Sequence, residues 1–198
     1  ERPMLFEGND LANIMLGQSV RRYLNEFNVV AGKEIILYGN NDSIYNTAID
    51  LSENNIKSKV IDVRAPGQES ETVTKAKGLG IDVFQGFAVI KAKGKSRVTG
   101  IEISQVENQA KPPHWKSKWR LTGDIKTLSC DLLATSGGFN PVVHLDCHCG
   151  GKTYFDEYSQ AFLPQKERNN RQVCGAVNSI GFWKDAIIDA KNKAQLTL

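Results

Sequence analysis

Short apolar runs alternate with segments of helical periodicity in the first half of this chain. Three of the runs have the composition of buried strands, at 34–38, 59–63 and 81–84. The segments between them carry apolar residues three or four positions apart, as in helices that pack on a sheet. This order predicts an α/β fold, a Rossmann-like parallel sheet with right-handed crossovers and helices on both faces.

A helix is expected on either side of this alternation. Upstream, apolar residues recur at helical spacing after Asn13, a possible cap, and they are Leu16, Val20, Leu24 and Phe27. They predict a helix of about four turns over residues 14–27. Near the other end of the chain, a final helix is predicted from the apolar face of Phe182, Ala186, Ala190 and Ala194.

The alternation of strand and helix patterns ends after Gly86. Residues 87–91 and 98–104 are apolar or alternating on the two sides of a Lys-Gly-Lys turn, which predicts an antiparallel hairpin. Residues 115–121 are expected to add a third strand and complete a small antiparallel β-meander. A further buried strand is predicted at 130–135, before a Gly-Gly loop.

Composition narrows the classes of function. The chain has 198 residues, which is enough to bury a core without a disulfide or metal. It contains no apolar run near the roughly 18 residues of a membrane span, so a membrane protein is excluded. Lys and Arg number 25 against 22 Asp and Glu, a small excess that makes nucleic acid an unexpected partner.

The start of the chain indicates whether it is part of a longer polypeptide, and its cysteines indicate its cellular location. The chain opens Glu1-Arg2-Pro3-Met4, without an initiator Met or a signal region, so we expect a piece of a longer polypeptide. The four cysteines contain no CxxC pair and no regular framework. A reducing cytoplasm is therefore the expected location.

The turn after the first predicted strand is the candidate nucleotide site. In a Rossmann unit, a glycine turn, the amino end of a helix and an acid closing the second strand bind the dinucleotide. Gly39 and Asp62 hold the first and last of these places. Asn41 and Ile44, however, stand where the motif has its second and third glycines, and Asp42 brings negative charge to the phosphate position. The turn is therefore expected to be structural, with Asp42 capping the helix; the alternative is a working site.

Two groups that could bind a metal or act as a base have simpler explanations. Cys147-His148-Cys149 offers thiolate and imidazole ligands, but no second pair completes a metal shell, so no metal site is expected. A C-x-C pair is also awkward for an unstrained disulfide. His144 is expected to be buried or to cap a helix beside Pro141.

Basic residues of the predicted meander could contact an anion or an acidic partner, and its tryptophans could stack on a nucleic-acid base. The hairpin tip carries Lys91, Lys93, Lys95 and Arg97, which are expected to be solvated. Trp115 and Trp119 share one face of a strand and are expected to pack against the sheet.

Four stretches of the chain resemble a known family. They are E-R-P-M-L-F-E-G-N-D at 1–10, I-M-L-G at 14–17, Y-G-N-N-D-S-I-Y at 38–45 and C-D-L-L-A-T-S-G-G-F-N-P-V-V-H-L at 130–145. Together they resemble the alpha subunit of heterotetrameric sarcosine oxidase over nearly the whole chain. The last stretch, which Gly150-Gly151-Lys152 follows, is the most specific.

The resemblance implies a fold with two dinucleotide-binding domains, like that of glutathione and thioredoxin reductases. Residues 32–138 would form the inserted, NAD(P)-binding-type domain with its meander. Residues 1–28 and 139–198 would return to the first domain, whose own glycine motif would lie upstream of Glu1. One departure from the related reductases falls at Asn178, which replaces an Asp that contacts the ribityl chain of a flavin.

The resemblance also implies cofactors and partners. The alpha subunit of this family is associated with NAD, and the complex carries FAD and FMN. The complex oxidises the N-methyl amine of sarcosine in its beta subunit, and a folate-binding module lies further along the alpha chain. This chain is then a non-catalytic scaffold whose partners are the rest of the alpha subunit and the other subunits. The alternative is an active NAD(P)H-binding domain of a flavin-dependent, disulfide-reductase-like oxidoreductase.

The candidate nucleotide contacts are Gly39, Asn40, Asn41, Asp62, Arg64, Gly137 and Gly138. None of them is expected to be catalytic, and no tightly bound cofactor is expected. Separated from its first domain, the chain is expected to expose an apolar patch near Phe139, Phe182 or Trp183 and to self-associate.

Overall fold

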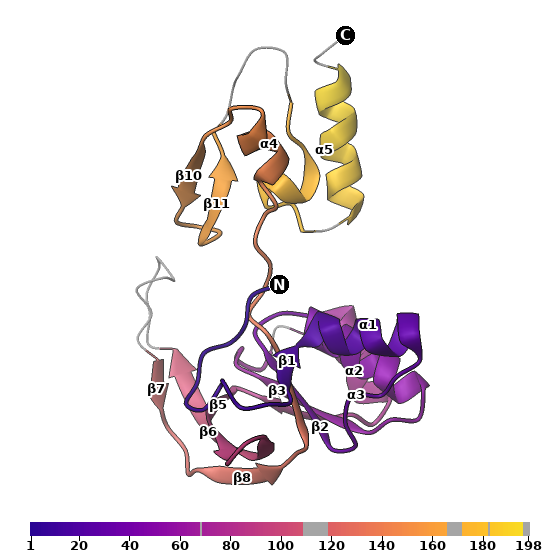
Figure 1. Cartoon of the computed structure of the whole chain (residues 1–198), viewed down its shortest axis with the longest axis vertical. Helices are drawn as coiled ribbons and strands as arrows, with labels where there is room; N and C mark the ends of the chain where they lie inside the picture. Colours follow the sequence, from indigo (N-terminus) through magenta and orange to yellow (C-terminus); the bar gives the residue numbers. More distant parts are fainter. Residues whose placement is uncertain (68, 109–118, 166–171, 182, 196–198) are drawn as a thin grey trace. The chain divides into compact units, whose positions relative to one another are not determined.

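A computed structural model describes residues 1–67, 69–108, 119–165, 172–181 and 183–195 (Figure 1). The described residues form two compact units. Unit 1 holds those up to Gly138, and unit 2 holds those from Phe139 onward. No helix within these ranges combines the length and the apolar character needed to cross a membrane.

Unit 1 is built on a five-stranded parallel sheet. Its strands are β1 (Ile14–Leu16), β2 (Ile35–Gly39), β3 (Ser58–Asp62), β4 (Asp82–Gln85) and β9 (Leu132–Ser136), in the order β1-β9-β2-β3-β4. All of the pairings are parallel. Strands β2, β3 and β4 follow one another toward one edge of the sheet. Strand β9, which comes later in the chain, pairs with the opposite side of β2. Strands β2 and β9 are buried along their whole length, which explains their nearly continuous apolar composition.

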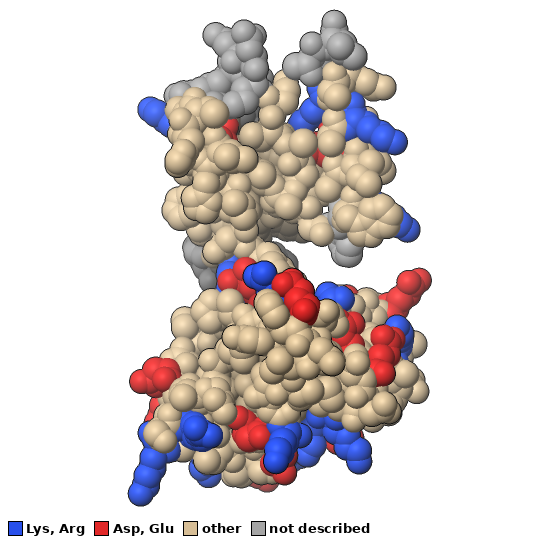
Figure 2. Space-filling model, turned by 45° about the vertical axis from the view of Figure 1, so that its right-hand side comes forward, with Lys and Arg blue, Asp and Glu red and all other residues tan. Residues whose placement is uncertain are grey.

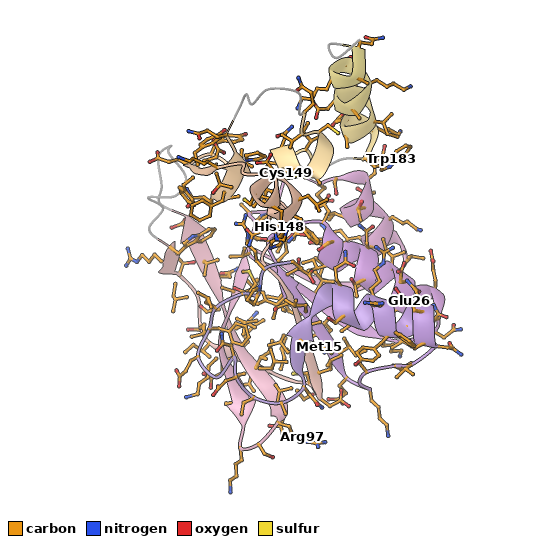
Figure 3. All side chains as sticks on the ribbon, turned by 45° about the horizontal axis from the view of Figure 1, so that its top comes forward. Met15, Glu26, Arg97, His148, Cys149 and Trp183 are labelled. Atoms are coloured by element: carbon orange, nitrogen blue, oxygen red, sulfur yellow. The ribbon has the colours of Figure 1, made fainter. Side chains whose placement is uncertain are left out.

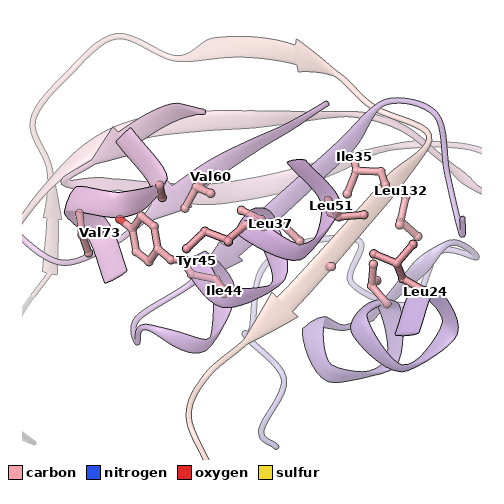
Figure 4. Close-up of a cluster of buried hydrophobic side chains, with 14 residues drawn as sticks. Leu24, Ile35, Leu37, Ile44, Tyr45, Leu51, Val60, Val73 and Leu132 are labelled. Carbon is pink, nitrogen blue, oxygen red and sulfur yellow. The ribbon is translucent and has the colours of Figure 1, made fainter. Parts of the chain in front are cut away.

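Three helices cover one face of this sheet, namely α1 (Gly17–Phe27), α2 (Ser43–Glu53) and α3 (Glu71–Gly78). Each helix buries an apolar stripe, because residues three and four positions apart share a helix face. Figure 4 shows the resulting cluster, in which Leu24, Tyr45 and Val73 from the three helices pack with strand residues such as Leu37 and Val60.

An antiparallel meander covers the other face. Its strands are β5 (Phe87–Gly94), β6 (Val98–Asn108), β7 (Trp119–Leu121) and β8 (Lys126–Ser129), and β6 pairs with each of the others. Ile101 and Ile103 of β6 form a second core with Ile36, Ile61 and Leu133 of the parallel sheet. The predicted hairpin is confirmed. Of the expected third strand, residues 119–121 are β7, and residues 115–118 lie outside the described residues.

The predicted fold class, a Rossmann-like parallel sheet with a meander, is confirmed. The strands expected at 34–38, 59–63 and 81–84 are β2, β3 and β4, displaced by one residue. The helices of unit 1 lie on one face of the sheet rather than on both. The meander takes the second face because the side chains of alternate strand residues, such as Ile36 and Leu133, point to that side.

The helix predicted over residues 14–27 is shorter than expected. Ile14–Leu16 form β1 beside β9, and α1 begins at Gly17. Asn13 does not cap the helix, because its backbone is left-handed, with φ 67°, and its Nδ2 donates to the carbonyl oxygen of Asp131 over 3.0 Å. Pairing with β9 gives the backbone of Ile14–Leu16 hydrogen bonds that the start of a helix lacks.

Unit 2 is small and thinly packed. It contains α4 (His144–His148), β10 (Thr153–Asp156), β11 (Ala161–Pro164), the 3-10 helix η2 (Gly175–Asn178) and α5 (Trp183–Gln195). Strands β10 and β11 form an antiparallel hairpin, and α5 confirms the predicted final helix over its described residues. The buried residues among those described are Asp146, Ala161, Pro164 and Gly175. In the face shown in Figure 2, charged side chains of both signs are interspersed over unit 1, whereas most of the charged side chains visible on the described part of unit 2 are Lys or Arg.

Residues 1–28 belong to unit 1 within this chain. Strand β1 and helix α1 pack on the same sheet as residues 32–138. The division of the whole polypeptide into two dinucleotide-binding domains, with 1–28 and 139–198 in the first of them, stays a prediction.

Candidate dinucleotide site

The carboxyl ends of three neighbouring strands meet at one edge of the parallel sheet. Gly39 of β2 is in register with Asp62 of β3 on one side and with Ser136 of β9 on the other. Helix α2 begins close to this edge at Ser43. In open α/β sheets, ligands bind in the crevice outside the carboxyl ends of the strands. The fold thus brings Gly39 and Asp62 together at the edge where a nucleotide would bind.

Gly39 is required by packing. A Cβ at this position would lie 2.5 Å from the carbonyl oxygen of Ser136 and 2.8 Å from Cγ2 of Ile44. Both distances are shorter than side chains tolerate, so β2, β9 and α2 approach each other this closely only because the residue is glycine. Ile44, at the place of the third glycine of the motif, is buried in the core under α2.

Asn41, at the place of the second glycine, fills the turn with its own amide. Its Nδ2 donates to the carbonyl oxygen and to Oγ of Ser136, both over 3.0 Å. Its Oδ1 accepts a hydrogen bond from the backbone N–H of Ser43 over 3.0 Å. Oγ of Ser43 and Oγ of Ser136 are 2.9 Å apart. The amide of Asn41 therefore takes a backbone donor at the start of α2 that a phosphate would otherwise accept from.

The carboxylate of Asp62 is fully buried, with 0% exposure, and its partners come from this chain. Oδ2 accepts from Oη of Tyr45 over 2.8 Å and from Nη2 of Arg64 over 2.9 Å. Oδ1 accepts from the backbone N–H of Arg64 over 2.9 Å, and Nε of Arg64 lies 3.1 Å from both oxygens. Both oxygens that would accept ribose hydroxyls already hold internal donors.

Arg64 joins the end of β3 to the turn after β2. Its Nη2 lies 2.8 Å from Oδ1 of Asp42, and its guanidinium lies over the ring of Tyr45, 5.9 Å from the centroid. Asp42 was expected to cap α2, and it occupies the N-cap position, but its side chain does not cap the helix. Its backbone is already helical, with φ −72° and ψ −12°, and its side chain makes no capping hydrogen bond but pairs with Arg64.

The surroundings fix the protonation of this cluster. Burial, and then the hydrogen bond to Asp62, raises the pKa of Tyr45 far above its usual value. Burial lowers the pKa of Arg64, but the hydrogen bonds and negative charges of Asp62 and Asp42 outweigh it and raise that pKa above its usual value. Raised pKa values keep Tyr45 and Arg64 protonated near neutral pH, which does not suit either group to acid–base catalysis.

The remaining candidates at this edge also have partners within the chain. The backbone N–H of Asn40 donates to the carbonyl oxygen of Ser136 over 3.3 Å. The N–H of Gly137 donates to the carbonyl oxygen of Arg2, and the N–H of Arg2 donates to the carbonyl oxygen of Gly138, both over 2.7 Å. A Cβ on Gly137 would come within 2.8 Å of the carbonyl oxygen of Pro3. Gly137 thus makes room for the N-terminal segment.

Sequence reasoning missed Tyr45 and Ser136, two residues that complete this edge. Ser136 stands at the end of a buried strand that pairs with β2, so the predicted sheet order places it beside Gly39. Tyr45 follows Ile44 in α2 and lies within the core, which its polar hydroxyl can enter only with a buried partner. An aromatic hydroxyl in a core-facing helix position is the signal that could have identified it.

Of the cysteine and histidine candidates, Cys130 lies in unit 1 and the others lie in unit 2. None of the four cysteines forms a disulfide, and three of them are exposed. Cys130 is buried, and burial is the main cause that raises the pKa of its thiol to about 12. His148 and Cys149 lie on and directly after α4 (Figure 3). Within the described ranges, no three His, Cys, Asp or Glu residues are grouped to hold a metal ion.

The prediction that His144 is buried or caps a helix is wrong. His144 is exposed and is the first residue of α4, whose cap is Val143. The residue that α4 buries is Asp146. The segment with Asn178 forms η2, and Nδ2 of Asn178 donates to the carbonyl oxygen of Val173 over 2.8 Å.

The basic residues of the meander hairpin are mostly paired or solvent-facing. Nζ of Lys91 lies 2.6 Å from Glu7, and Nζ of Lys93 lies 2.8 Å from Glu102. Arg97 projects from the hairpin tip (Figure 3). Trp119 was expected to pack on the sheet and is instead half exposed, because β7 pairs with β6 at the margin of the meander.

Comparison with proteins of known function finds sarcosine oxidase alpha subunits. The chain is 33% identical over 182 residues to that of Corynebacterium sp. (strain P-1), 34% to that of Corynebacterium sp. (strain U-96), and 28% over 175 residues to that of Rhizobium meliloti (strain 1021). The resemblance to sarcosine oxidase alpha subunits is confirmed. The matches cover 91%, 91% and 88% of this chain, but the chain spans only 18%, 18% and 16% of these alpha subunits.

Solved structures with the same fold include oxidoreductases. Mycobacterium tuberculosis FprA in complex with NADPH has a TM-score of 0.69 and 15% identity, over all of this chain and 60% of FprA. Lactococcus lactis thioredoxin reductase has a TM-score of 0.66 and 15% identity, over all of this chain and 61% of the reductase. At this identity the likeness establishes the fold alone. No family model matches the chain.

Proposed function

We propose that this chain is a non-catalytic, Rossmann-type scaffold domain in the alpha subunit of a sarcosine oxidase-type oxidoreductase. The observation that carries the proposal is the buried carboxylate of Asp62, whose oxygens already accept from Tyr45 and Arg64. A dinucleotide would have to displace these donors before its ribose could bind. The place of Asn41 in the turn supports the same conclusion, because its amide takes the N–H of Ser43.

The whole protein supplies the chemistry in this proposal. NAD would be associated with the alpha subunit, and FAD and FMN with the complex. The oxidation of sarcosine would occur in another subunit. We further propose that this complex is a cytoplasmic heterotetramer, and that this chain contacts the rest of the alpha subunit and the other subunits. The similarity to sarcosine oxidase alpha subunits over nine tenths of the chain supports this assignment.

A second candidate function is an active NAD(P)H-binding domain of a flavin-dependent reductase. It is favoured by the position of Arg64 at the end of β3, where an arginine can accommodate the 2′-phosphate of NADP. The shared fold with FprA, a protein solved with NADPH, is consistent with it. Under this alternative, Asp62 and Arg64 would have to release each other when the nucleotide binds.

Calorimetric titration of the chain with NAD, NADH and NADPH separates the two functions. The scaffold predicts dissociation constants no tighter than about 1 mM, equivalent to about −4 kcal/mol. A thioredoxin reductase of the same fold, titrated with NADPH, is the positive control. Saturable binding of any of the three nucleotides in the micromolar range would establish the alternative and overturn the scaffold.

A further inference from the structure

We infer that a second small-molecule site, for a monocarboxylate with a hydrocarbon chain, lies at the amino edge of the parallel sheet. An open cleft with a volume of about 710 Å³ lies at this edge, where β2, β3 and β4 begin. Its volume is within the range of small-molecule sites. The cleft is at the opposite edge of the sheet from Gly39 and Asp62, so the inference does not depend on whether a nucleotide binds there.

Hydrogen bonds within unit 1 hold the walls of the cleft. The loop from α2 to β3 turns at Asn55, which is left-handed with φ 60°, and the N–H of Ile56 donates over 2.9 Å to a carbonyl oxygen of the last turn of α2. The loop from α3 to β4 makes the same kind of turn at Gly80, with φ 74°. The backbone N–H of Lys33, before β2, lies 2.9 Å from both carboxylate oxygens of Asp131. A cleft formed in this way needs little ordering when a ligand binds.

Three aliphatic side chains line the cleft. Ile56 and Ile81 come from the two loops and are partly buried against the core under the helices. Leu79 is 45% exposed. A ligand with a hydrocarbon chain would remove this apolar surface from water, which favours binding.

Three lysines, Lys33, Lys57 and Lys59, also line the cleft. Among the described residues, no ion pair engages the ammonium group of any of them. Other lysines of unit 1 do pair with a glutamate, namely Lys75, Lys77, Lys91 and Lys93. The cations of the cleft are therefore available to an anionic group of a ligand.

The charges around the cleft favour one carboxylate over a phosphate. Glu34 and Asp82 line it together with the three lysines, which leaves a formal charge of +1 for a single carboxylate to neutralise. Helices α2 and α3 end beside the cleft, and the carboxyl end of a helix carries partial negative charge. Phosphate groups favour the amino ends of helices instead. Together with the aliphatic lining, these charges define the ligand class.

The test is a titration of the isotope-labelled chain with octanoate, followed through the chemical shifts of the backbone amides. We expect saturable shifts at residues 55–59 and 79–82, at concentrations below those at which octanoate forms micelles. Butanoate has half as many carbon atoms and should bind about tenfold more weakly. Octanol lacks the charge and should bind about fivefold more weakly than octanoate.

Variants separate the contribution of charge from that of the aliphatic lining. The double variant Lys33→Gln, Lys57→Gln should bind octanoate about tenfold more weakly and octanol as the unchanged chain does. Leu79→Asn should weaken both ligands. The matched control is the double variant Lys95→Gln, Lys126→Gln, which removes the same charge from exposed positions of the meander outside the cleft and should change neither affinity.

Circular dichroism confirms that each variant is folded, and Lys59→Gln must show the loss if the double variant of the cleft does not fold. A folded cleft variant that binds octanoate as tightly as the unchanged chain overturns the site. Octanol that binds as tightly as octanoate overturns it too, and so do shifts confined to unit 2. Inorganic phosphate that moves the same amides with the affinity of octanoate overturns the ligand class. The proposed function is tested separately by the nucleotide titration, and none of these outcomes changes it.

Discussion

The two units of the chain use their apolar residues in opposite ways. Unit 1 buries them in two cores, one under the helices and one under the meander. Unit 2 exposes most of its large apolar side chains, and α5 contains no buried residue in its described part. Tyr158 is 94% exposed and Trp183 is 69% exposed. A sheet that is covered on both faces buries a large apolar surface. A two-stranded hairpin with separate short helices buries much less, so it is less stable on its own.

We expect the exposed apolar side chains of unit 2 to be the surface through which it packs against a further partner. The pattern of α5, with Ile187 and Ile188 beside Trp183 on its surface, is that of a helix made for a further packing partner. Three experiments test this difference in apolar burial between unit 1 and unit 2.

The largest difference between the units should appear when one buried residue of unit 1 and one exposed residue of unit 2 are truncated and the free energies of unfolding are compared. Leu133→Ala removes a side chain with 0% exposure between the sheet and the meander, and we expect it to lower the free energy of unfolding by about 2–5 kcal/mol. Ile188→Ala, at a position 56% exposed, should change it by less than about 0.5 kcal/mol. Urea unfolding followed by circular dichroism measures both. Similar losses for the two variants would contradict the contrast.

Alkaline pH should destabilise unit 1, because its core buries the phenol of Tyr38 and the thiol of Cys130. Burial raises the pKa of Tyr38 from 10.0 to about 12, and burial, then the charges of Asp131 and Glu34, raises that of Cys130 from 9.0 to about 12. The unfolded chain then loses these protons at lower pH than the folded chain does. The free energy of unfolding is therefore fully retained below pH 9 and falls as pH rises from 9.0 to about 12.

Each unit of pKa difference is worth about 1.4 kcal/mol of stability. Urea midpoints measured from pH 8 to 11 should show the decline. The Tyr38→Phe, Cys130→Ala double variant should have a shallower slope, because neither replacement ionises. Equal slopes in the two proteins would show that other groups cause the alkaline loss.

Self-association should depend on α5. The apparent mass in light scattering should rise with protein concentration, because the apolar side chains of unit 2 can pack against a second copy. Ile188→Lys should weaken this rise, and Asn192→Lys, which adds the same charge at an exposed polar position of the helix, should weaken it less. A chain that stays monomeric up to its solubility limit would refute the expectation.

The sequence predicted the parallel core well because that core follows from local pattern. The apolar runs of β2, β3 and β4 can be buried on both faces only inside a sheet, and the helices between them determine a parallel arrangement. The start of α1 was misplaced, since Ile14–Leu16 fit a helical stripe as well as an edge strand. Only the distant partner β9 decides between the two.

The candidate site was predicted in position but not in detail. The spacing of Gly39 and Asp62 placed both at the carboxyl edge of the sheet, where the structure has them. Their hydrogen-bond partners come from outside the motif, since Tyr45 and Ser136 reach the edge through the packing of α2 and β9. Whether a polar side chain serves a ligand or a neighbour depends on such three-dimensional contacts, which a single sequence does not record.

The hydrogen bonds that Arg2 exchanges with the Gly137–Gly138 pair have a consequence for modularity. They bring the entry of unit 1 next to its exit, with each N···O distance 2.7 Å. A polypeptide whose two ends meet in this way can be spliced into a surface loop of another protein without stretching either junction. We therefore expect a circularly permuted version of residues 2–138, which links these ends and opens the chain at the exposed hairpin tip near Lys95, to fold to the same sheet.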